Sequence, residues 1–139
     1  MNKLNKKVEY ALMALKHFSD LEQARGENLE VTVTAKQISE LNHSPTEVTA
    51  RVLQVLSSHG ILKAEYGVNG GYRLAKDLAQ VTIHDLVNIV EGSTDLTKCL
   101  SDKECDLLKN CTIISPVENL NKKVQDFYKS ISLQEVFRV

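Results

Sequence analysis

All the cysteines of this 139-residue chain lie in one short segment, CLSDKECDLLKNC, at positions 99, 105 and 111. Their spacing, C-x5-C-x5-C, is regular, whereas incidental buried cysteines would be scattered along the chain. Three thiols are one fewer than the four ligands that zinc or an iron–sulfur cluster usually takes, and one more than a single disulfide uses. The segment therefore predicts metal binding or thiol redox chemistry, with a fourth ligand to be found elsewhere.

The spacing alone leaves several kinds of site open. Zinc sites usually contain C-x2–4-C pairs, and none occurs here. Two of the three thiols could form a disulfide on oxidation, which would make a purely thiol-based switch. A lapsed site that binds nothing is the remaining alternative. An iron–sulfur cluster is also possible, because thiolates are its usual protein ligands.

The composition is that of an ordinary globular protein, with 42% hydrophobic and 25% charged residues. No apolar run is long enough to span a membrane, and the basic, amphipathic N-terminus lacks the features of a signal peptide. We therefore expect a cytoplasmic protein with reduced thiols. The net charge of −1 does not by itself suggest a nucleic-acid partner, since residues 1–80 carry ten Lys and Arg against nine Asp and Glu.

Two helix starts close together predict a helix-turn-helix unit. In TAKQ, Thr34 and Gln37 form a capping-box pattern, and SPTE repeats it with Ser44 as the cap, Pro45 as the first helical residue and Glu47 closing the box. The second helix should end near Ser58, before Gly60. We expect its inner face to comprise Val48, Val52, Leu53 and Leu56, and its outer face Thr46, Thr49, Ala50 and Arg51. An ordinary helical hairpin would show the same pattern.

The next segment, ILKAEYGVNGGYRLAKD, reads as strand, glycine-rich turn and strand. A hairpin directly after a helix-turn-helix unit predicts a winged helix-turn-helix. The glycines lack the lysine of a nucleotide-binding loop and do not stand between a strand and a helix. The hairpin is therefore expected to be a wing rather than a phosphate cradle.

Two further helices are expected after the wing. Thr82 and Asp85 begin a short one that ends at Gly92, and SPVE at 115–118 begins a long one. The long helix has an apolar stripe at Val117, Leu120, Val124, Phe127, Tyr128 and Ile131. This stripe could dock on the first helix, expected over about 5–21 with its own stripe of Val8, Leu12, Leu15 and Phe18. We favour pairing with a second copy of the chain.

The order of these parts resembles a family, the dimeric winged helix-turn-helix iron–sulfur regulators that include IscR and NsrR. LNKKVEYALMAL is similar to the family's first helix, GVNGGYRL to its wing and SISLQEVF to its C-terminal segment. The resemblance covers almost the whole chain. It implies a mainly α fold with a small β-hairpin wing, a DNA-binding domain at 1–80, and a cluster-binding loop with a long dimerisation helix at 81–139.

The resemblance also implies the ligands of the cluster. Cys99, Cys105 and Cys111 would hold a 2Fe–2S or 4Fe–4S cluster. In the IscR branch a histidine three residues after the last cysteine completes the site, but this chain has Ile114 there, which cannot ligate. In the NsrR branch a carboxylate early in the partner's first helix serves, and Glu9 stands at that position. Asp102, Glu104, Asp106, water or an external thiol are the alternatives.

By the same resemblance, a homodimer would present two recognition helices to a double-stranded DNA operator. Ser44, Thr46 and Thr49 would reach the major groove, Asn69 and Gly70 the minor groove, and Lys6, Lys7 and Arg73 the phosphates; Arg51 and Tyr72 complete the expected set. The chain shows no catalytic constellation, so we expect neither an enzyme nor a small-molecule substrate. The expected function is transcription regulation controlled by a cluster that senses iron–sulfur status, redox state or nitric oxide. A redox-sensing repressor that uses thiols without a cluster is the alternative.

Overall fold

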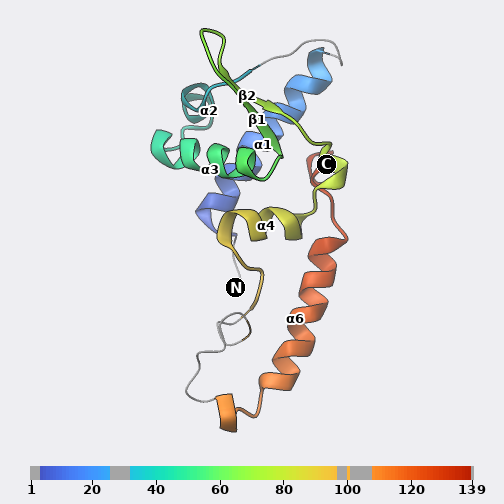
Figure 1. Ribbon diagram of the computed structural model, residues 1–139. Helices are drawn as coiled ribbons and strands as arrows, with labels where there is room; N and C mark the ends of the chain where they lie inside the picture. The colour runs from blue at the N-terminus through green and yellow to red at the C-terminus, as the bar shows by residue number, and fades with distance from the viewer. Residues whose placement is uncertain (1–3, 26–31, 97–99, 101–107, 139) are drawn as a thin grey trace.

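The computed structural model describes residues 4–25, 32–96, 100 and 108–138, and it has the expected fold class, helical with one two-stranded antiparallel hairpin (Figure 1). In chain order the described elements are α1 (Lys6–Arg25), α2 (Ala35–Asn42), α3 (Thr46–Ser58), β1 (Leu62–Glu65), β2 (Gly71–Leu74), η1 (Leu78–Gln80), α4 (Ile83–Glu91), η2 (Leu108–Asn110), α6 (Ile114–Lys129) and α7 (Leu133–Phe137).

Helix α1 lies at the centre of the core, in contact with α2, α3, α4 and β2. Of its expected stripe, Val8, Leu15 and Phe18 are buried, whereas Leu12 is half-buried. Ala11 and Ala14 are also fully buried. Because alanine has only a Cβ, these two positions let the neighbouring helices come close to α1. The helix continues past the expected end at Leu21 to Arg25.

Two of the expected capping boxes are confirmed. The Thr34 hydroxyl accepts from the Gln37 amide at 3.1 Å, while the Gln37 side chain accepts from the Thr34 amide at 2.8 Å. Thr82 and Asp85 form the same pair of bonds at the start of α4, at 3.1 and 3.0 Å. Helix α4 ends at Gly92, whose φ of 90° is the left-handed conformation that glycine adopts without strain.

The other two expected helix starts are wrong in detail. Pro45, rather than Ser44, is the N-cap of α3, and no side chain caps this helix. The Ser44 hydroxyl bonds instead to the Thr49 hydroxyl at 2.7 Å, so it is committed inside the turn. Helix α6 begins at Ile114, which places Ser115 within its first turn. The sequence pattern predicts where a helix starts. Whether the Ser or Thr hydroxyl caps that helix depends on which hydrogen-bond partners the fold brings near it.

The β-hairpin is confirmed, with Leu62 opposite Leu74 and Glu65 opposite Gly71. The segment before α2 fastens its base, because Val33 and Tyr72 exchange two backbone hydrogen bonds of 2.8 Å. Gly71 makes this close approach possible. Its φ is +146°, and a Cβ there would lie 2.9 Å from the backbone of Val33.

Helix α6 extends away from the rest of the molecule and packs mainly on α4 (Figure 1). The chain then returns to the core through α7, where Leu133 is fully buried. Two backbone bonds fasten this return, from the Ile83 amide to Ile131 and from the Leu133 amide to Val81, at 2.9 and 2.8 Å. No described helix is both long and apolar enough to cross a membrane.

The two kinds of helix start predict different effects of removing a hydroxyl. Thr82→Ala breaks a real capping box and should lower the free energy of unfolding by about 1 kcal/mol. Ser115→Ala removes an exposed hydroxyl that caps nothing, so its effect should stay within about 0.5 kcal/mol. Urea denaturation of the two variants beside the wild type measures both values. The N-cap of α6 is Ile113, the residue before the helix. If both variants lost the same free energy of unfolding, this assignment would be contradicted.

Candidate nucleic-acid interface and cysteine loop

Helices α2 and α3 form a tight helix-turn-helix whose geometry is fixed by paired hydroxyl groups. Ser39 Oγ and Thr46 Oγ1 lie 3.1 Å apart across the two helices, and the Ser44–Thr49 pair lies in the turn. His43, the residue that ends α2, adopts a left-handed φ of 53° that reverses the chain direction. These contacts hold α3 at a set angle to the body of the protein.

Helix α3 has one buried and one exposed face. Val52, Leu53 and Leu56 are buried as expected, and Val48 is half-buried. The expectation that Thr49 faces outward is wrong, because its side chain is only 2% exposed and is used in the turn.

The exposed face of α3 carries Thr46, Glu47, Arg51 and Gln54. Gln54 was missed by the sequence reasoning, although it stands three residues after Arg51 and so on the same side of the helix. Ser44 is half-buried at the helix start and bonded to Thr49. The face that could contact a nucleic acid is therefore set by Thr46, Arg51 and Gln54.

The tip of the wing is strongly exposed. Tyr66 and Val68 have exposed fractions of 94% and 104%, and Asn69 is exposed while Gly70 is half-buried. The hydroxyl of Thr32 donates to the Asn69 carbonyl at 2.8 Å, which ties the tip to the segment before α2. Large apolar side chains at an exposed tip are consistent with a contact surface, and neither Tyr66 nor Val68 was an expected contact.

Two residues expected to contact DNA belong to the stem of the wing. Arg73 Nε donates to Glu65 Oε1 at 2.9 Å, and this hydrogen bond lowers the pKa of the Glu65 carboxyl. Tyr72 is half-buried and packs against the core. Both side chains therefore have structural partners that keep the two strands together.

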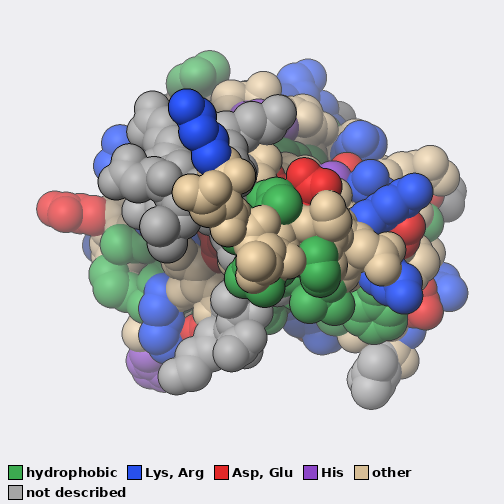
Figure 2. Space-filling model, turned by 90° about the horizontal axis from the view of Figure 1, so that it is seen from below, with side chains coloured by type: hydrophobic (Ala, Val, Ile, Leu, Met, Phe, Trp, Pro, Cys, Tyr) green, Lys and Arg blue, Asp and Glu red, His purple; other side chains and the backbone are tan. Residues whose placement is uncertain are grey.

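Cations lie among anions on the one face of the molecule that Figure 2 shows. At the start of α1, Lys6 pairs with Glu9 at 3.1 Å, and this hydrogen-bonded carboxylate raises the pKa of Lys6. The neighbouring Lys7 is exposed. Seen from the α6 end, blue and red side chains are interspersed around the molecule (Figure 2). A nucleic acid would meet local pairs of cations.

Of the cysteine triad, the structure describes only Cys111, which is half-buried and reduced between η2 and α6. Cys99 and Cys105 lie outside the described residues, as do Asp102, Glu104 and Asp106. Ile114 is the first residue of α6. Glu9 stands in the first turn of α1, with its side chain 38% exposed. Among the described residues, no three His, Cys, Asp or Glu side chains gather as a metal site.

A polar clasp joins the beginning of the cysteine loop to α6. The Leu96 amide donates to Asn121 Oδ1 at 2.9 Å, and Asn121 Nδ2 donates to Asp95 Oδ1 at 3.0 Å. Gln125, one turn further along α6, donates to the same carboxylate oxygen at 2.8 Å. Asn121 is 8% exposed, so these bonds are shielded from water. The chain is thereby fixed to α6 three residues before Cys99.

Another face of α6 is apolar and uncovered. Ile113, Leu120 and Phe127 follow at intervals of seven residues and are 59%, 53% and 61% exposed. Val117 and Val124 alternate with them at three- and four-residue steps, which is the pattern of a helix-pairing seam. Four members of the expected stripe, Val117, Leu120, Val124 and Phe127, lie in this seam, whereas Tyr128 is half-buried and Ile131 follows the end of α6.

The comparisons with known proteins agree with this architecture. Residues 4–138 match the Rrf2 family profile, described as an iron-dependent transcriptional regulator. The regulator IscR of Photorhabdus laumondii is 26% identical over 107 residues, which cover 77% of this chain and 65% of that protein.

Two solved structures have the same fold. The IscR of T. potens has a TM-score of 0.68 at 21% identity, covering 98% of this chain and 86% of that one. CymR, the global cysteine regulator of B. subtilis, also gives 0.68 at 21% identity, covering 99% of this chain and 98% of that one. The family and the named relatives are regulators and not enzymes, as expected. The chain belongs to the Rrf2 family of winged-helix, DNA-binding transcriptional regulators.

Proposed function

We propose that this regulator binds its operator as a homodimer under the control of an iron–sulfur cluster held by Cys99, Cys105 and Cys111. The observation that carries the proposal is the C-x5-C-x5-C triad in a chain of an iron-dependent family. The relationship to IscR supports it. Three thiolates and one carboxylate are a suitable donor set for iron.

The clasp fixes the chain just before the cysteine segment. Asp95, Asn121 and Gln125 fix the chain before Cys99, and Cys111 lies three residues before the start of α6. Ile114, Asn121 and Gln125 share one face of α6, because they are seven and four residues apart. The residues before Cys99 are thus attached to the same face on which α6 begins.

Glu9 is our choice for the fourth ligand. Its side chain is accessible, and its described partner is the exposed Lys6, whose ion pair with it contributes little at a surface. The carboxylate can therefore exchange that partner for a metal at little cost. In this proposal the cluster supplies a charge and a set of bonds that depend on iron, redox state or nitric oxide. Helices α6 and α1 transmit the presence of the cluster to α3.

A thiol switch without a cluster is the second candidate. It is favoured by Ile114, because the IscR-type histidine is missing, and by the shared fold with the global cysteine regulator CymR. In that case two of the three thiols would form a disulfide on oxidation.

Spectroscopy of anaerobically purified protein separates these candidates. The wild type should show the visible absorbance and circular dichroism of an iron–sulfur protein, and Cys105→Ala should lose both. Glu9→Ala should change the spectrum, because it removes a ligand. The matched control is Asp20→Ala, which removes another ion-paired carboxylate of α1.

A spectrum unchanged by Glu9→Ala would place the fourth ligand elsewhere. A colourless wild type without iron or sulfide would exclude the cluster. The thiol switch would then be tested by the loss of DNA binding under an oxidant.

For DNA binding, we propose that α3 enters the major groove with Thr46, Arg51 and Gln54. Ser44, which lies just before α3, reaches the same groove. The wing tip at Asn69 and Gly70 approaches the minor groove, while Lys6 and Lys7 are placed for phosphates. Residues 1–80 would thus bind DNA, and 81–139 would sense and dimerise.

Replacing Arg51 tests this orientation. If it contacts a phosphate, Arg51→Gln should reduce the slope of log K against log salt by about one. Lys123→Gln removes an exposed cation of α6 and serves as the control. Fluorescence anisotropy of a labelled operator over a salt series gives the slopes. Equal slopes for the wild type and Arg51→Gln would remove Arg51 from the interface.

The apolar seam of α6 predicts how the dimer forms. Leu120→Glu combined with Phe127→Glu places charges in the seam, so the protein should change from two chains to one at micromolar concentration. Lys122→Glu, exposed on another side of α6, should leave the dimer intact. Light scattering after gel filtration measures the mass. A dimeric double variant would show that the chains pair elsewhere.

A further inference from the structure

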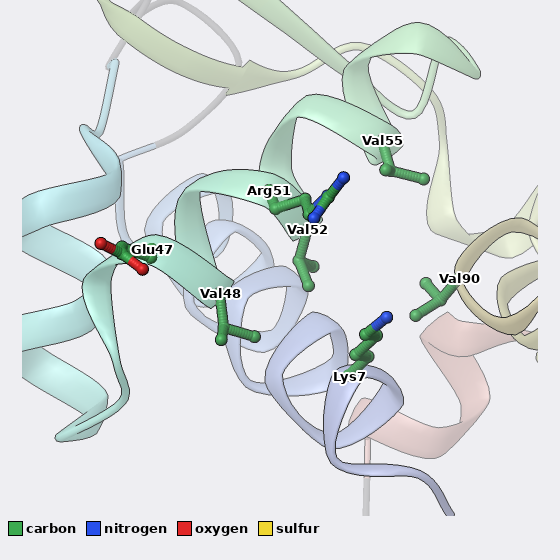
Figure 3. A pocket seen from close by; sticks show the side chains of 7 residues that line it. All are labelled: Lys7, Glu47, Val48, Arg51, Val52, Val55 and Val90. Atoms are coloured by element: carbon green, nitrogen blue, oxygen red, sulfur yellow. The ribbon is translucent and has the colours of Figure 1, made fainter.

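A pocket of about 510 Å³ lies between α1, α3 and α4. It is lined by Lys7 of α1, by Glu47, Val48, Arg51, Val52 and Val55 of α3, and by Val90 of α4 (Figure 3). Its volume is in the range that holds a small organic molecule. Lys7 and Arg51 are also proposed DNA contacts, but no function proposed above places a small ligand in this space.

The lining combines an apolar wall with two positive charges. Val52 is buried, Val48, Val55 and Val90 are half-buried, and all four valines line the pocket. The ammonium group of Lys7 and the guanidinium group of Arg51 turn toward the same space from different helices (Figure 3). The carboxylate of Glu47 points away at the far end (Figure 3).

Within the described part of the chain, neither cation forms an ion pair with a carboxylate. The ion pairs of the described residues join Lys6 to Glu9, Lys16 to Asp20, and both Lys63 and Arg73 to Glu65. Lys7 and Arg51 are in none of them within that part of the chain. Two cations beside an apolar wall attract an anion, and the wall favours one with an aliphatic body.

We infer that this pocket binds a small amphipathic carboxylate, with the carboxylate between Lys7 and Arg51 and the aliphatic part against the valines. A bare inorganic anion would gain nothing from the four valines. A neutral molecule of the same shape would leave both cations without a partner. The chemical class is thus a short acyl or branched aliphatic acid.

Titration of the ¹⁵N-labelled full chain tests the pocket, with hexanoate as the probe and hexanamide as its neutral counterpart. Hexanoate should give saturable shifts of the amide signals of Val48, Val52, Val55 and Val90. Hexanamide should bind about tenfold more weakly, because it lacks the charge. Inorganic phosphate should not displace hexanoate at equal concentration.

Two variants locate the binding. Lys7→Gln removes one cation, and Val90→Phe fills the space without removing either cation. Each variant should weaken the binding of hexanoate at least about tenfold. Lys36→Gln removes an exposed cation of α2 and should have no effect. If Val90→Phe does not fold, Lys7→Gln alone decides. Any of four results would overturn the inference. The shifts could be absent or fail to saturate, or hexanamide could bind as tightly as hexanoate. Phosphate could displace hexanoate, or the same shifts could appear when the protein is diluted without hexanoate.

Occupancy of the pocket should also weaken DNA binding, because the carboxylate would neutralise Arg51. This consequence rests on the proposed role of α3, whereas the titration does not. Hexanoate that binds in the pocket but leaves operator affinity unchanged would overturn the coupling and the place of Arg51 at the DNA.

Discussion

The packing of α1 is the contact on which the other parts of this protein depend. Ala11, Ala14 and Leu15 are completely buried, and Phe18 nearly so. Helices α3 and α4 both rest on this face, and α4 in turn supports α6. Helices α3 and α6 are therefore both oriented, directly or through α4, by one surface. A shift of α1 against α4 would move both, which is how a signal at the cysteine loop could reach α3.

Polar pairs decide the finer geometry of the two functional regions. The Ser44–Thr49 hydroxyl pair sets the turn before α3, and the bonds of Asn121 to Asp95 and Leu96 set the start of the cysteine loop. Each pair is largely shielded from water, so leaving one partner unmatched would cost more than the bond itself contributes. Such pairs favour one arrangement of the chain over its alternatives.

Helix α6 separates two tasks on two of its faces. Its polar face, with Asn121 and Gln125, binds Asp95, whereas the seam of Ile113, Leu120 and Phe127 is exposed and is the surface that we propose for pairing with a second chain. The net charge of −1 gives the chain no overall electrostatic attraction to DNA. In the proposed dimer, two copies of α3 would contact the operator, which would offset this weakness.

The sequence by itself determined the fold class, the helix-turn-helix, the wing, the α6 stripe and the family, because these depend on local periodicity, capping pairs and glycine positions. Only the tertiary structure decided which partner each polar side chain has and whether it is buried. Ser44 does not cap, Thr49 is buried, and Arg73 is held by Glu65, since each found a partner from a neighbouring element. The pocket between Lys7, Arg51 and Val90 could not be predicted from the sequence either, because residues of three separate helices line it. Local patterns are fixed by neighbours in sequence, whereas the partner of a hydroxyl or a cation is fixed by neighbours in space.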